Sequence, residues 1–456
     1  MTATTNLPRA SARTTYRSVF GVGEFRLLFA GQLIYILGTE FEILGLSVFV
    51  YAQTRSALLA ALAFSMGFAP QVVGGMLFTS LADRLPPRTV ITTGLLIRAA
   101  PGLLIGVAPR LPVAVMLGLV AVAAMAAPVF SAAITALLAD VLDGDRFIVG
   151  RSIMNLTSSG GQILGLGISG AILALLPARR LLLVAGCALV LSSLVRLGLR
   201  SRPPRTIART AARPAAGRDP GGPGRPGAPK ARGTVRATLA GNARLFADPV
   251  IRGQMLAQWL PCSCVVGAES LIVPYTHALG HPASTAGPLL AVMPAGMLVS
   301  DVIVGRFCRS ATRERLAFPL ALLLGVPMLV FAFRLPLPIV VGLLFVSALG
   351  FGYMLGIQQA FLDSVPPSLR GQAFGLNSTG LMSGQGLLPP VAGAVAMGVG
   401  AGPAMALAGL AAILAALALR RPLTPLAEPR PPSLTLPAEP RPPSLTLLAE
   451  PRPPCG

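Results

Sequence analysis

Apolar blocks of about 20 residues recur along most of this 456-residue chain, and they limit the folds that it can adopt. An α-helix rises about 1.5 Å per residue, so a block of this length crosses a hydrocarbon core about 30 Å thick. Apolar residues make up 54% of the chain and charged residues only 12%, unlike a typical soluble domain. The chain is therefore predicted to be an all-α membrane protein.

Twelve spans can be drawn on this basis, and an internal repeat divides them into two halves. Gly31-Gln32 returns 222 residues later as Gly253-Gln254, and Gly75-Met76-Leu77 returns 221 residues later as Gly296-Met297-Leu298. Such offsets predict two six-helix halves from a duplication, and parallel repeats of this kind place a transport site between them. The predicted halves are 25–199 and 253–419, with spans near 25–51, 57–79, 89–108, 112–139, 152–176, 180–199, 253–278, 284–305, 315–333, 337–362, 372–397 and 402–419.

Three segments outside the spans have compositions of their own. Residues 1–24 are polar and lack the apolar stretch of a signal peptide, so a cytoplasmic N-terminal tail is predicted. Residues 200–252 are rich in Arg, Pro and Gly, which predicts a disordered cytoplasmic linker with a short interfacial helix near 234–246. Residues 420–456 repeat the sequence Ala-Glu-Pro-Arg-Pro-Pro and are predicted to be a disordered cytoplasmic tail.

The formal net charge of +21 is unevenly distributed over the connections between spans. One set of alternate loops holds only five arginines: Arg55, Arg110, Arg179, Arg180 and Arg334. Lys and Arg accumulate on the cytoplasmic side of membrane proteins, so these loops are predicted to be external and both termini cytoplasmic. The basic segments are expected to face anionic membrane lipid rather than nucleic acid. A multi-pass protein of the bacterial inner membrane is predicted.

Two acids near the middle of the first span are its most unusual residues. Glu40 and Glu42 lie on different faces of a helix because they are two positions apart. On a helical wheel Glu42 shares an arc with Gln32, Tyr35 and Thr39, and this polar arc is predicted to line a cavity between the halves. Glu40 falls among apolar side chains, so a packing role is its alternative.

Span 7 carries a similar stripe. Gln254, Gln258, Glu269 and Thr276 share one face, so Glu269 is expected to face the same cavity from the opposite half. A carboxyl group removed from water binds a proton more readily, so acids in these positions are candidates for binding protons or a cationic group. The predicted substrate- or proton-binding residues are Glu42, Glu269, Glu40, Gln32, Tyr35 and Gln258.

Arg98 lies in the middle of the third span, where an unpaired guanidinium group would be expensive. A structural ion pair is therefore predicted for it, with Glu40 as a candidate partner.

Other kinds of chemistry find little support in the sequence. No Gly-x-x-x-x-Gly-Lys-Ser/Thr phosphate loop is present, so ATP is not expected to drive the protein. His277 and His281 lie four residues apart without an acidic third ligand nearby, so neither a metal site nor another cofactor is predicted. The cysteines lie mostly in or near apolar spans and are expected to pack.

The loop after the second span reads Thr79-Ser80-Leu81-Ala82-Asp83-Arg84-Leu85-Pro86-Pro87-Arg88. It resembles the signature loop between spans 2 and 3 of the major facilitator superfamily. Asp83, Arg84 and Arg88 match that pattern, whereas the two prolines depart from it. The resemblance implies that these three residues latch the cytoplasmic side during alternating access. Asp301 and Arg306 are predicted to be their counterparts in the second half.

Two further segments resemble the bacterial branch of this superfamily that contains drug, macrolide and siderophore exporters. Residues 241–252 are similar to the segment that leads into its span 7, and Arg98 falls where the branch often has an arginine. Gly165-Leu166-Gly167-Ile168-Ser169-Gly170 resembles the antiporter motif without its proline. The resemblance implies the major facilitator fold and export.

A secondary active transporter is therefore predicted, which exports a small amphipathic molecule such as a drug, an antibiotic or another secondary metabolite. Protons would drive export, and the protein would act as a monomer. The alternatives are a metabolite importer of the same fold, or a membrane-embedded enzyme or non-transporting scaffold. An enzyme would need a nucleophile or a His-carboxylate set at one depth, and the sequence offers none.

Overall fold

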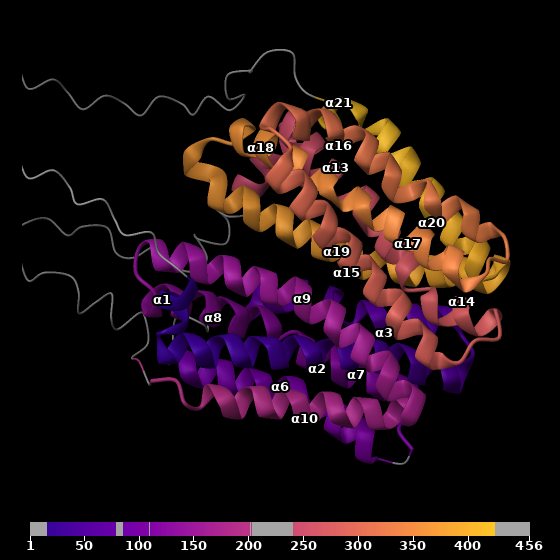
Figure 1. The fold of residues 1–456 in the computed structure, drawn as a ribbon, viewed down its shortest axis with the longest axis horizontal. Coiled ribbons are helices and arrows are strands. Elements are labelled where there is room, and N and C mark those ends of the chain that lie inside the picture. The colour runs from indigo at the N-terminus through magenta and orange to yellow at the C-terminus, as the bar shows by residue number, and fades with distance from the viewer. Residues whose placement is uncertain (1–15, 79–84, 109, 201, 203–239, 425–456) are drawn as a thin grey trace, which may run out of the picture.

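The computed structural model describes residues 16–78, 85–108, 110–200, 202 and 240–424, and the regular structure in these ranges is entirely helical. The helices form two bundles that lie side by side, one from each half of the sequence (Figure 1). The all-α membrane fold with two six-helix halves, predicted from the apolar blocks and the repeat, is confirmed.

The N-terminal half begins with the short helix α1 (Tyr16–Phe20) and is organised around the long helix α2 (Gly23–Thr54). Several of its helices start at proline or after a capping side chain. Pro87 opens α6 in the first helical position, where its missing N–H is not needed, and Ser56 accepts the backbone N–H of Leu59 at the start of α3. The remaining helices are α3 (Ala57–Ser65), α4 (Ala69–Phe78), α6 (Pro87–Val107), α7 (Val113–Ala124), α8 (Ala127–Val141), α9 (Asp145–Leu175) and α10 (Ala178–Arg196).

The C-terminal half repeats this plan. Asp248 caps the helix α13 by accepting the backbone N–H groups of Val250 and Ile251. Residues 240–247, just before it, are also helical. The elements are α13 (Pro249–Glu269), α14 (Ile272–Ala278), η1 (Ala283–Thr285), α15 (Ala286–Val302), η2 (Ile303–Phe307), α16 (Ser310–Gly325), η3 (Pro327–Ala332), α17 (Leu337–Leu349), η4 (Gly350–Gly352), α18 (Tyr353–Ser364), η5 (Pro367–Leu369), α19 (Arg370–Val399), α20 (Ala401–Ala418) and α21 (Arg420–Leu423).

Eleven helical segments of the described chain are long and apolar enough to cross a membrane. The remaining span is span 11, the helix α19, whose 30 residues include Gln372, Asn377 and Gln385 and pack against α13 and α3. Spans 2, 4 and 7 are each broken into two helices by a turn, and span 10 by the 3₁₀ segment η4. In span 7 the break follows Glu269 directly.

The two halves pack together toward one end of the bundle. The end where α10 stops and α13 starts is here named the linker end, and the opposite end the far end (Figure 1). α3 packs on α19 and α9 packs on α15. Glycines allow the close approach: a Cβ atom at Gly287 would lie 2.5 Å from the backbone nitrogen of Gly170, and one at Gly393 would lie 2.7 Å from the Cα of Leu58.

Candidate functional site

The polar arc of α2 points into the N-terminal half. The Arg98 Nη1 atom on α6 donates to Oε1 of Glu42 at 2.6 Å, and each side chain is only 2% exposed. The second carboxylate oxygen of Glu42 is buried without a hydrogen-bond partner among the described residues. The ion pair predicted for Arg98 therefore forms with Glu42, and the candidate partner Glu40 was wrong.

The linker-end part of the same arc meets a second buried arginine, Arg196 at the end of α10. Its Nη2 donates to Oε1 of Gln32 at 3.1 Å and its Nη1 donates to Ser192 at 3.0 Å. Gly31 leaves room for the guanidinium group, because a Cβ atom there would lie 2.7 Å from Nε of Arg196. Arg196 is fully buried, and it was not among the site residues predicted from the sequence.

The arc faces the interior of the N-terminal half for a physical reason. Two buried guanidinium groups need oxygen partners, and α2 supplies them from this face. Tyr35 also turns inward, where its ring packs edge-on against Phe130 of α8 at 5.4 Å. Gln32 and Glu42 thus bond to arginines of their own half, and a transport role for Gln32, Tyr35 and Glu42 stays a prediction.

Glu40 instead lies on the α2 face that meets α9. A Cβ atom at Gly165 would come within 2.9 Å of the Glu40 Cβ, so this glycine makes room for the glutamate side chain. Gly161 does the same for Ile36 one turn earlier. Glu40 is half-buried, and no ion pair or hydrogen bond to its carboxyl group is found in the described part of the chain. Both roles considered for Glu40, proton binding and packing, therefore stay predictions.

Glu269 approaches Glu40 from the other half. The two carboxyl groups are close enough to interact electrostatically, although 229 positions separate them in the chain. Glu269 is half-buried at the C-terminal end of α13, directly before the turn that breaks span 7. Helix C-terminal ends carry partial negative charge, so this position offers a carboxylate no helix-dipole support. A proton shared between the acids, or a cationic group beside them, would relieve their repulsion.

The other polar residues of the span 7 stripe bond within the C-terminal half. Gln258 is 8% exposed and its Oε1 accepts from the side-chain amide of Asn377 on α19 at 2.9 Å. Trp259, the only tryptophan of the sequence, donates to Asn377 Oδ1 at 2.8 Å. Gln254 donates to Ser364 at 3.2 Å. These contacts join α13 to α18 and α19, and substrate binding by Gln258 stays a prediction.

The predicted latch residues are only partly covered by the structure. Asp83 and Arg84 lie outside the described residues, while Arg88 is half-buried in the first turn of α6. Asp301 and Arg306 are both exposed at the linker end of span 8, where η2 gives the helix a π turn. No ion pair joins Asp301 to Arg306. The latch function of all five stays a prediction.

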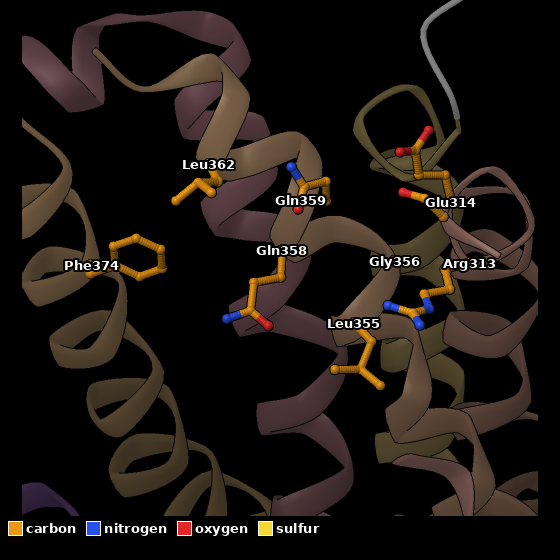
Figure 2. Close-up of a pocket in the computed structure, with 9 residues that line it drawn as sticks. Arg313, Glu314, Leu355, Gly356, Gln358, Gln359, Leu362 and Phe374 are labelled. Atoms are coloured by element: carbon orange, nitrogen blue, oxygen red, sulfur yellow. The ribbon is translucent and has the colours of Figure 1, made fainter. Parts of the chain in front are cut away.

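A pocket of about 240 Å³ lies elsewhere, near the linker end of the C-terminal half. Figure 2 shows the side chains of α16, α18 and α19 that line it. Its arginine, Arg313, donates to the carbonyl oxygens of Val304 at 3.0 Å and Cys308 at 2.9 Å, so it caps the preceding turn. Neither Glu40 nor Glu269 lines this pocket. Within the described ranges, no three His, Cys, Asp or Glu side chains gather as metal ligands would.

Comparisons with solved structures show which fold this is. A peptide transporter POT in complex with sulfate is 14% identical with a TM-score of 0.64, over 87% of this chain and 94% of that chain. The xylose transporter XylE from E. coli, in an inward open conformation, is 14% identical with a TM-score of 0.60, over 88% and 96%. A bacterial homologue of the human lysosomal transporter Spinster, inward-facing and unoccupied, is 14% identical with a TM-score of 0.60, over 88% and 95%.

At these identities the likeness shows the fold alone. No curated protein matches this chain in sequence. A family model described as Major Facilitator Superfamily matches residues 28–368, which is most of both halves. The chain belongs to the major facilitator superfamily.

Proposed function

We propose that this protein is a proton-coupled secondary transporter that exports a small amphipathic molecule from the bacterial cytoplasm by alternating access. Membership of the superfamily makes it a multi-pass membrane transporter rather than an enzyme. The coupling ion, the direction and the type of substrate are the proposed parts. The protein would work as a monomer in the cell membrane, with both termini in the cytoplasm.

The approach of Glu40 to Glu269 carries this proposal. Each acid comes from a different half, each lies well inside its span, and neither has a cationic partner among the described residues. Two carboxyl groups that interact inside a membrane protein are costly when both are ionised. Binding a proton or an organic cation relieves that cost. Because alternating access moves the two halves relative to each other, it would change the affinity of this pair in each cycle.

Export, rather than import, is proposed from two resemblances: residues 165–170 of span 5 to the antiporter motif, and residues 241–252 to the segment that leads into span 7 of the exporter branch. Gly161 and Gly165 of the antiporter-like stretch pack on α2 beside Glu40, whereas Gly170 packs on the other half at Ser284 and Pro288. The stretch therefore lies between the acid pair and the far-end contact of the halves. If the linker end is cytoplasmic, as the distribution of arginines predicts, the halves are closed toward the outside.

Everted membrane vesicles with an imposed proton gradient test the proposal. Tetraphenylphosphonium and ethidium serve as amphipathic cation probes, and collapse of the gradient on their addition reports coupled transport. We expect Glu40→Gln and Glu269→Gln to abolish this response and Glu314→Gln, at the linker end, to retain it. Accumulation that ignores a protonophore, or survives in the double Glu40→Gln/Glu269→Gln variant, contradicts the coupling. Comparing the small molecules retained by cells with and without the protein then identifies the natural substrate.

A further inference from the structure

The two histidines of the chain, His277 and His281, lie together at the far end, beside the contact between the halves. His277 is the penultimate residue of α14, which packs against α2 and α3 of the other half (Figure 1). Its Nε2 is hydrogen-bonded to the guanidinium group of Arg55, the residue that directly follows α2. Its ring also meets the ring of Tyr51 edge-on, with centroids 5.4 Å apart. His277 therefore joins the two halves directly.

The positions of Arg55 and His277 make this contact a property of the fold. The residues are 222 positions apart, the offset of the internal repeat, so they occupy equivalent positions near the end of the first span of each half. Equivalent ends of parallel repeats meet at the pseudo-twofold axis. Arg55 has φ 54°, the only positive φ of a non-glycine among the described residues, a conformation that side chains with a Cβ disfavour. Arg55 thus adopts the left-handed conformation that glycine usually takes at the C-terminal end of a helix.

The hydrogen bond assigns different roles to the two side chains. Arginine only donates, so Nε2 accepts, and an accepting imidazole is neutral. Protonation removes the acceptor and places two cations side by side. Histidine is the side chain whose charge ordinarily changes between pH 5 and 8.

No acid is at hand to offset a protonated His277. From α2 it faces Tyr51 and Arg55, while α3, η1, α20 and the first turns of α15 offer no titratable group. The loops at the far end contain no Asp or Glu in the sequence, and His281 and Arg334 would add only positive charge. Protonation would therefore repel Arg55 with nothing to compensate.

We propose that His277 is a proton-binding site at the far end, and that its contact with Arg55 is a latch that protonation from that side releases. A neutral His277 holds the halves together, and a protonated His277 pushes the end of α2 away from the end of α14. Two like unit charges about 4 Å apart in water repel each other by about 1 kcal/mol. Repulsion of this size would raise the ratio of open to closed protein roughly fivefold. This latch is separate from the Glu40 and Glu269 pair and does not depend on it.

Distances across the far end test the latch. Spin labels at Gln53→Cys and Ala283→Cys, both exposed positions, report on α2 and on η1 when the five native cysteines are replaced. Double electron–electron resonance on the full-length protein in lipid nanodiscs at about pH 8 and about pH 5.5 brackets ordinary histidine titration. We expect the longer-distance population to rise about fivefold, relative to the closed one, on acidification.

Variants at His277 separate this latch from other acid effects. Glutamine keeps an acceptor and cannot titrate, so His277→Gln should stay closed at both pH values, while His281→Gln should respond like the parent. Arg55→Gln removes the repulsion and should lose the response independently. The proposal is overturned if the parent shows no pH-dependent shift, or if His277→Gln shifts as much as the parent. The first of these two outcomes needs only the parent protein, so the proposal can be overturned even if a variant folds poorly.

Discussion

Replacing Glu42 by glutamine should destabilise the protein far more than the same change at Glu40, two residues away. Arg98 and Glu42 are each 2% exposed and joined at 2.6 Å, so loss of the carboxylate leaves a buried guanidinium group uncompensated. Removing one partner of a buried ion pair costs about 3–5 kcal/mol. Glu40 has no ion-pair partner in the described structure and is half-buried, so Glu40→Gln should cost no more than about 1 kcal/mol.

Equilibrium unfolding in mixed micelles with a denaturing detergent, followed by far-ultraviolet circular dichroism, measures both free energies. The double variant Glu42→Gln/Arg98→Met removes the stranded charge and should recover most of the lost stability. A double-mutant cycle then gives the coupling between the two side chains. A free energy of unfolding for Glu42→Gln within about 1 kcal/mol of the parent's, or a further loss of stability on adding Arg98→Met, would contradict a stabilising ion pair.

Three glycine substitutions test the packing around the site. Gly165→Leu should displace the Glu40 side chain, and we expect proton-coupled transport to fall at least tenfold while thermal stability changes less than for Glu42→Gln. Gly287→Leu would drive a side chain into the backbone of α9, so cross-linking across the far end should decrease. Gly31→Ala should lower the free energy of unfolding by about 1–3 kcal/mol, because the new Cβ would meet Nε of Arg196 at 2.7 Å. Unchanged transport in Gly165→Leu, unchanged cross-linking in Gly287→Leu or an unchanged free energy of unfolding in Gly31→Ala would contradict the corresponding expectation.

Much of the fold could be predicted because membrane spans are written in single stretches of sequence. The span drawn at 25–51 is the helix Gly23–Thr54, and the span at 372–397 is the helix Arg370–Val399. Breaks inside spans were not predicted. In spans 2 and 4 apolar composition continues through the turn, and the available signals were Pro70 and Pro128, each in the first turn of the helix that follows.

The site was harder to predict because a helical wheel shows which residues share a face, but not what that face meets. Gln32, Tyr35 and Glu42 do share a face, and it meets arginines from α6 and α10. One signal was present: Arg98 and Arg196 both lie in spans, and together they need more polar partners than Glu40 alone supplies. The network of Gln258, Trp259 and Asn377 had no signal, since it joins residues 119 positions apart.

We propose that Glu40 and Glu269, and not Glu42, bind the protons that drive transport. Infrared difference spectroscopy of the purified protein, titrated through neutral pH, detects the carbonyl stretch of protonated carboxyl groups directly and needs no substrate. We predict a titrating band that decreases in Glu40→Gln and Glu269→Gln, disappears in the double variant and persists in Glu42→Gln. A band that is unchanged in the double variant, or lost only in Glu42→Gln, would contradict the account.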